Sequence, residues 1–131
     1  MDTLVKYKGL KNSKDWEIGN LINYKEGLAA IETAKALYYV FHESVSRFTG
    51  CKTNSGIEVY EGDLIAQDDH EKNIISIVYL DQLDGQWKLD PVGSDSHLRY
   101  KVRDCITGTV IGHAFTHQHL LSNSILRTLK S

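Results

Sequence analysis

Short runs of alternating or β-branched residues, separated by turn-forming clusters, are the feature that most constrains the fold of this chain. Thr3–Leu10 and Trp16–Asn23 alternate with a period of two, which places successive side chains on opposite faces of a strand. Asn73–Leu80 is strongly β-branched, and an Asp-Gly pair connects it to a further strand at Gln86–Leu89. Asp-Gly favours a tight hairpin because glycine adopts positive φ at little cost. The pattern predicts a mainly β protein.

Three further segments complete the predicted order. Thr107–Phe115 is typical of a strand. Leu28–Phe41 is open between helix and strand, because its Ala, Glu, Lys and Leu content suits a helix whereas its Tyr, Val and Phe residues suit strands. His117–Lys130 has leucine and isoleucine at helical spacing and basic residues near its end, which predicts a C-terminal helix.

Composition narrows the class of protein. The 131 residues fit one domain, and 41% hydrophobic with 24% charged residues is typical of a folded chain. A formal charge of −2 gives no strong field for phosphate backbones or anionic lipid. No apolar run is long enough to span a bilayer, no signal peptide is visible, and the two cysteines do not form a disulfide framework. We therefore expect a reduced cytoplasmic protein without cofactors or membrane contact.

The segment FTGCKTNSGIEVYEGDLI, residues 48–65, has a partial echo in residues 7–22, YKGLKNSKDWEIGNLI. Each copy is predicted to form a strand, a turn and a second strand, with a glycine where the second strand begins. Two copies are too few for a solenoid, so a duplicated hairpin or convergence on hairpin chemistry explains the echo.

Residues 48–65 also resemble the signature of the YopX family of phage and prophage proteins. Trp16-Glu17-Ile18-Gly19 resembles an upstream element of that family, and Val110-Ile111-Gly112-His113 resembles its closing run. Cys51 stands where the family usually has leucine, and His117-Gln118-His119 where it usually has Asn-Pro-Glu. The residues that carry the resemblance, with an expected structural role, are Trp16, Gly19, Gly50, Gly56, Tyr60, Glu61, Gly62, Asp63 and Gly112.

The resemblance implies an SH3-like small β-barrel, a tendency to form homo-oligomers and no catalytic residue. We expect a single domain over residues 1–131. Residues 1–44 would form an extra N-terminal hairpin segment, and residues 45–131 a barrel core with the C-terminal helix.

Two polar clusters are candidates for chemistry. Glu58, Glu61 and Asp63 lie close in sequence; alternation would place the last two on one face, and we expect Asp63 to accept amide hydrogens of the turn beside Gly62. His113, His117 and His119 have spacing that could hold a metal on a helix, but the β-branched residues before His113 predict a strand. We expect no metal site, although the sequence leaves this histidine cluster open.

The two cysteines are the candidates for a nucleophile. Cys51 or Cys105 with a histidine could form a nucleophilic pair, yet Cys51 occupies an apolar position of the hairpin. The sequence also has no nucleophile elbow, phosphate loop or dinucleotide motif. We therefore expect a non-enzymatic protein.

Two basic-aromatic segments are candidates for nucleic-acid contact. The first contains Lys6, Lys8, Lys11 and Lys14 with Tyr7, Trp16 and Tyr24, and the second contains Arg99, Tyr100, Lys101 and Arg103. Alternation would place Lys6 and Lys8 on one face and Tyr7 on the other, which is also the pattern of an ordinary half-buried strand. If nucleic acid binds, we expect the contacts at Lys6, Lys8, Arg99, Lys101 and Arg103.

Self-association is the remaining candidate property. Asn73–Leu80 is too hydrophobic for an exposed edge strand, and Leu120–Leu129 has an apolar stripe that must be covered. Either both close one barrel, or one of them docks onto a neighbouring subunit. We thus expect a phage or prophage protein in the bacterial cytoplasm that acts as an oligomeric binding or assembly module with an unknown phage or host partner. The alternative is a nucleic-acid-associated accessory protein.

Overall fold

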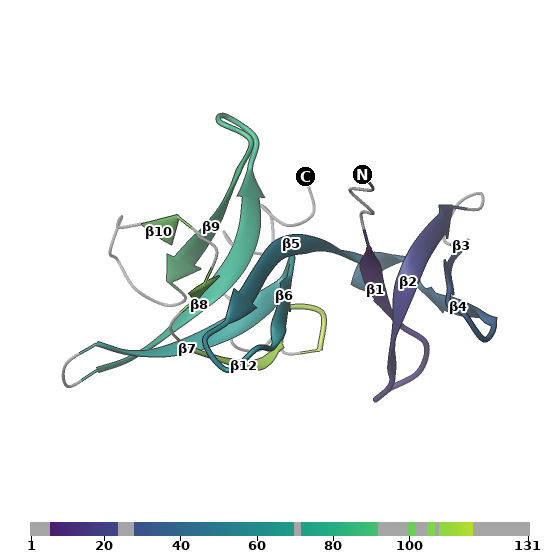
Figure 1. Cartoon of the computed structure of the whole chain (residues 1–131), viewed down its shortest axis with the longest axis horizontal. Helices are drawn as coiled ribbons and strands as arrows, with labels where there is room; N and C mark the ends of the chain where they lie inside the picture. Colours follow the sequence, from purple (N-terminus) through teal and green to yellow (C-terminus); the bar gives the residue numbers. More distant parts are fainter. Residues whose placement is uncertain are drawn as a thin grey trace. The chain divides into compact units, whose positions relative to one another are not determined.

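The computed structural model describes residues 6–23, 28–69, 72–91, 100–101, 105–106 and 108–116. The chain divides into two compact units, residues 1–48 (unit 1) and residues 49–131 (unit 2). The boundary falls inside a strand, at Phe48, whereas the sequence analysis placed it between residues 44 and 45 of one domain. Figure 1 shows the strands of both units.

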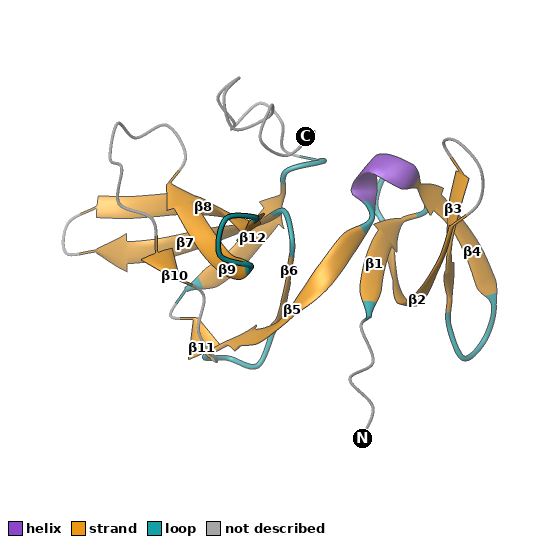
Figure 2. Cartoon of the chain, turned by 90° about the horizontal axis from the view of Figure 1, so that it is seen from above, coloured by secondary structure: helices purple, strands orange, loops and turns teal. Residues whose placement is uncertain are grey.

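Unit 1 is an antiparallel meander whose last strand returns beside its first. Its elements are β1 (Tyr7–Leu10), β2 (Trp16–Asn23), β3 (Leu28–Glu32), β4 (Leu37–Phe41), the 3-10 helix η1 (His42–Ser44) and the start of β5 (Ser46–Thr53). The strand order is β5-β1-β2-β3-β4, so that β4 is the terminal strand (Figure 2). The predicted N-terminal hairpin is therefore only the first half of a larger sheet.

Residues 28–41 form two strands, and the helical alternative is wrong for this segment. Thr33 closes the turn between the strands: its backbone N–H donates to the Ala36 carbonyl at 2.9 Å, and its Oγ1 accepts the N–H groups of Lys35 at 3.1 Å and Ala36 at 3.2 Å. Helical propensity is overridden because both strands bury one face. Ala29 and Ile31 pack with Val40 in a core cluster.

The inner face of unit 1 curls around this core. Tyr7, Leu21 and Val45 pack against the cluster from β1, β2 and the start of the return segment. A Cβ added to Gly9 in β1 would lie 2.7 Å from the Val40 side chain in β4, although the two strands are not neighbours in the order. The absence of a side chain at Gly9 lets the two strands approach across the core.

Unit 2 contains a second antiparallel sheet of five strands. The strands of unit 2 after β5 are β6 (Glu58–Tyr60), β7 (Asp63–Asp69), β8 (Lys72–Asp81), β9 (Gln86–Pro91), β10 (Tyr100–Lys101), β11 (Cys105–Ile106) and β12 (Thr109–His113). The sheet has the order β10-β9-β8-β7-β12, while β6 and the parallel strand β11 pair with β5. The core cluster consists of Cys51, Val59, Ile65, Val78 and Leu89, with Trp87 and Val110 packed against it.

One fold expectation differs from this architecture, and another falls on residues that the structure does not describe. The described strands of unit 2 form an open path from β10 to β12 and do not close into the predicted barrel. The C-terminal helix predicted for residues 117–130 lies outside the described residues. In the described part of the chain, no helix is long and apolar enough to cross a membrane.

The predicted echo between the two hairpins is only partial. Gly62 immediately precedes β7 and has a φ of 84°, whereas Gly19 lies inside β2 and has no positive φ. A Cβ at Gly19 would instead clash with the Glu32 carbonyl of β3. The two matching glycines thus have different structural roles: Gly62 allows a turn with positive φ, and Gly19 allows β2 and β3 to pack closely.

Candidate functional site

The Tyr60–Asp63 segment, which we name the signature turn, is the most polar feature of the unit 2 interior. Asp63 is fully buried, and its Oδ2 accepts the backbone N–H of Tyr60 at 2.7 Å. The predicted role of this carboxylate as an acceptor in the turn is confirmed. The predicted alternation is wrong here, because Glu61 and Gly62 form a turn and are not extended.

The side chain of His113, at the end of β12, forms a hydrogen bond to the signature turn. Its Nδ1 accepts the N–H of Phe115 at 3.0 Å, so the hydrogen belongs on Nε2, which donates to the Glu61 carbonyl at 3.0 Å. A Cβ added to Gly62 would lie 2.6 Å from that Nε2. Glycine is therefore required at this position by its positive φ and by the imidazole above it.

Two backbone hydrogen bonds complete the attachment. Gly62 donates its N–H to the Val78 carbonyl in β8 at 2.8 Å, and Ala114 donates to the Gly62 carbonyl at 2.8 Å. The signature turn is thus held by β8 and by the segment after β12, and its polar groups serve the fold.

The acids of this region do not form an open catalytic pair. The Tyr60 hydroxyl donates to Glu58 Oε1 at 3.1 Å, and burial, together with this hydrogen bond, raises the pKa of Tyr60 above its ordinary value. Asp63 is inaccessible to a substrate because it is fully buried.

The histidine and cysteine candidates are only partly described. His113 lies in a strand as predicted, whereas His117 and His119 lie outside the described residues. Among the described residues, no group of three or more His, Cys, Asp or Glu is placed to hold a metal ion. Cys51 is buried in the unit 2 core as predicted, and Cys105 begins β11, where its backbone is paired with Lys52.

The first basic-aromatic segment forms three stacked pairs in unit 1. Lys6 Nζ lies 4.8 Å from the centroid of the Phe48 ring, and Lys8 Nζ lies 4.7 Å from that of Trp16. Alternation is as predicted, since Tyr7 packs into the core while these lysines stack on aromatic rings of neighbouring strands. Each such contact stabilises an exposed site by about 0.5–1 kcal/mol.

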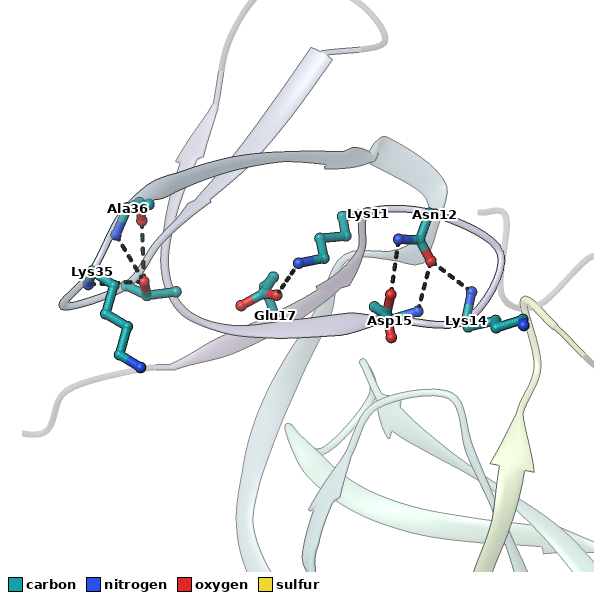
Figure 3. Close-up of polar contacts among 8 residues, drawn as sticks. Lys11, Asn12, Lys14, Asp15, Glu17, Lys35 and Ala36 are labelled. Atoms are coloured by element: carbon teal, nitrogen blue, oxygen red, sulfur yellow. Dashed lines mark hydrogen bonds and ion pairs between the residues drawn. The ribbon is translucent and has the colours of Figure 1, made fainter.

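The third pair involves Lys11, which follows β1. Its Nζ lies 4.4 Å from the centroid of the Tyr38 ring and 2.7 Å from Glu17 Oε2 (Figure 3). The hydrogen bond to Glu17 raises the pKa of Lys11, and desolvation opposes it. Lys14 is exposed in the adjacent turn, where Asn12 Oδ1 accepts the Lys14 N–H at 2.8 Å.

The second basic-aromatic segment belongs to unit 2 and is described only in part. Arg99 and Arg103 lie outside the described residues, and Tyr100 and Lys101 form β10, which pairs with β9. The hydrophobic segment Asn73–Leu80 falls within β8, between β7 and β9. It is an interior strand, so it is not the edge through which a neighbouring subunit could add a strand.

An apolar surface of β4, absent from the sequence predictions, is the most unusual exposed feature. Leu37, Tyr39 and Phe41 share the outer face of the strand and are 41%, 64% and 51% exposed. Ile18 lies on the same face in β2 and is 46% exposed. We name these four residues the outer apolar face. The signal was present in the sequence, because LYYVF is apolar on both faces of a strand.

Most of the chain matches one protein family. The family model of the YopX protein matches residues 2–122, most of both units. This chain belongs to the YopX family. The resemblance to the YopX family inferred from the sequence is therefore confirmed, and the segment on which it rested contains the signature turn. No curated protein and no solved structure significantly matches the chain.

Proposed function

We propose that this YopX protein is a non-enzymatic binding and assembly module of phage or prophage origin, acting as a homo-oligomer in the cytoplasm of the bacterial host. The observation that carries the proposal is the outer apolar face on β4. A half-buried strand normally presents polar residues to water, and one that is apolar on both faces is suited to burial on both. A row of exposed large apolar side chains along one strand favours an interaction role.

The character of the signature turn supports a non-enzymatic role. Asp63 is buried and bonded to the Tyr60 N–H, and both ring nitrogens of His113 are engaged with backbone groups. Polar groups that already serve the fold are poor candidates for proton transfer to a substrate.

The finer fold proposal concerns unit 1. We propose that the SH3-like part of the YopX fold lies here and not in unit 2. Four meandering strands, one turn of 3-10 helix and a fifth strand that returns beside the first support this assignment. So does the close approach of Gly9 to Val40 across the core.

The experiment that tests assembly is light scattering on the full chain over a concentration series from a few micromolar upward. We expect a mass above that of the monomer that rises with concentration. A strict monomer at the highest concentration would overturn the assembly proposal. Affinity capture from lysogenic cells would then identify any heterologous partner.

A second candidate function is nucleic-acid association through unit 1. It is favoured by one observation, the stacking of Lys6 on Phe48 and of Lys8 on Trp16, because such pairs offer both a cation and a ring to a single strand. Retention on single-stranded DNA should fall with salt and weaken in a Lys6→Ala/Lys8→Ala variant, but not in Lys14→Ala. Retention that ignores salt would exclude this candidate.

A further inference from the structure

The terminal strand of unit 1 carries exposed apolar side chains at the end of its sheet. β4 ends the strand order of its sheet, as Figure 2 also shows, and its exposed side chains alternate with buried ones along Leu37–Phe41. A strand at a sheet edge offers backbone groups to an added strand, and exposed apolar residues make that addition favourable.

The sequence of β4 is self-complementary in the antiparallel direction. If two copies pair about a two-fold axis at Tyr39, that residue faces its own copy and Leu37 faces Phe41. An isologous contact of this kind repeats every interaction, since residue i meets residue j and residue j meets residue i. Aromatic and aliphatic cross-strand pairs stabilise such ladders by about 0.2–1 kcal/mol each.

Charge at the two ends of β4 reinforces the same register. Lys35 lies before the strand and Glu43 lies after it, at equal separations from Tyr39 along the chain. Both side chains are exposed, and neither has an ion-pair partner among the described residues. The antiparallel pairing would bring each Lys35 toward the Glu43 of the other copy, twice per dimer.

Both charged ends are held in place by the fold. Lys35 sits in the turn between β3 and β4, beside Ala36 (Figure 3), and its N–H donates to Thr33 Oγ1. Glu43 lies in η1, where Ser44 Oγ donates to the Phe41 carbonyl at 2.7 Å and accepts the Leu10 N–H at 2.8 Å. The backbone at each end is thus ordered before association, so that mainly the two side chains lose conformational freedom on binding.

From these observations we propose that two copies of this chain associate through antiparallel addition of β4 to β4, which places Leu37, Tyr39 and Phe41 of the two copies side by side on one face and pairs Lys35 with Glu43. The inference rests on the proposed assembly function and names its partner and register. A nonspecific apolar surface would associate whatever the charges beside it. The proposed register instead predicts which charge variants of Lys35 and Glu43 associate with one another.

The test uses Lys35→Glu and Glu43→Lys, measured separately and mixed, by light scattering on the full chain. Each variant alone should self-associate roughly tenfold more weakly, because two exposed ion pairs become two like-charge contacts. An equimolar mixture should recover wild-type association, since the mixed pair again has opposite charges at both ends. Lys14→Glu, which changes the net charge equally but lies away from β4, should associate like the wild type.

The outcomes separate this inference from the function on which it rests. If the wild type associates but the mixture stays as weak as the single variants, β4 pairing is wrong while assembly stands. A wild type that never associates overturns both. Circular dichroism should show native β structure in all variants, because the changed side chains are exposed; Tyr39→Lys, with like charges directly opposed, provides an independent variant expected to abolish association.

Discussion

The signature turn and the outer apolar face differ in how completely the chain satisfies them. In the signature turn, a buried carboxylate, an imidazole and a glycine at positive φ are matched by partners within unit 2. On β4, large apolar side chains remain exposed to solvent at 41% to 64%. The comparison teaches that the polar residues of the signature turn maintain the fold, whereas the exposed apolar residues of β4 carry no recognisable motif.

The largest expected effect tests whether the signature turn depends on contacts inside unit 2, in particular on glycine at position 62. Gly62→Ala should destabilise unit 2 by about 3 kcal/mol or more, because it combines left-handed strain with a clash against His113. Gly56→Ala is the matched control: its φ of 89° is similar, but a Cβ there meets nothing within 4 Å, so about 1 kcal/mol is expected. Chemical denaturation measures both, and equal losses would break the claim.

A second pair of substitutions compares the two regions directly. Asp63→Ala should lower the free energy of unfolding by about 2–3 kcal/mol, because it leaves the buried Tyr60 N–H without its acceptor. Tyr39→Ala should cost less than about 1 kcal/mol at a concentration where the chain is monomeric, since the side chain is mostly exposed. A larger loss at Tyr39 than at Asp63 would reverse the comparison.

Buried serines sharpen the contrast between satisfied and unsatisfied groups. Ser44→Ala should cost about 2 kcal/mol because the Ser44 hydroxyl has two backbone partners, Leu10 and Phe41. Ser76 is equally buried, but among the described residues its Oγ has no hydrogen-bond partner. Ser76→Ala should therefore be neutral or slightly stabilising in thermal unfolding, and a loss comparable to that of Ser44→Ala would contradict this view.

The smallest expected effect concerns an exposed ion pair in the β8–β9 hairpin, between Lys88 in β9 and Asp84 in the turn. Lys88 Nζ lies 2.8 Å from Asp84 Oδ2, and this hydrogen bond lowers the pKa of Asp84. A carboxyl with a lowered folded pKa contributes stability above its ordinary pKa of about 4, and the contribution is lost as pH falls through the folded value. In an NMR titration, Lys88→Met should raise the pKa of Asp84 and Lys14→Met should leave it unchanged; no response to Lys88→Met would refute the assignment.

Much of the fold could be predicted because strand alternation and turn chemistry act locally. β2 matches its predicted bounds, and the Asp-Gly hairpin forms with Gly85 at a φ of 70°. Residues 28–41 could not be assigned because their helical propensity competes with burial against β1 and β2, which is a tertiary effect. The same limit explains why the barrel expected for residues 45–131 differs from the open path of the described strands. Closure depends on long-range strand pairing, which no local sequence pattern specifies.

The candidate site was harder to predict than the fold. The acceptor role of Asp63 follows from turn chemistry, but the contact between Gly62 and His113 joins residues far apart in sequence. The outer apolar face was overlooked because LYYVF could be interpreted as a buried segment. The register of β4 against β3 pairs Val40 with Ala29 on the core face, and by alternation this leaves Tyr39 on the opposite face.

The most direct test of the central claim measures mass and stability together for Tyr39→Asp in the full chain. The account predicts that light scattering shows the loss of self-association. It also predicts that the unfolding midpoint, measured at dilution, stays near that of the wild type, because the signature turn and both cores are untouched. Retained association with the wild-type concentration dependence would contradict it, since the outer apolar face would then not be the surface through which copies of this YopX protein meet.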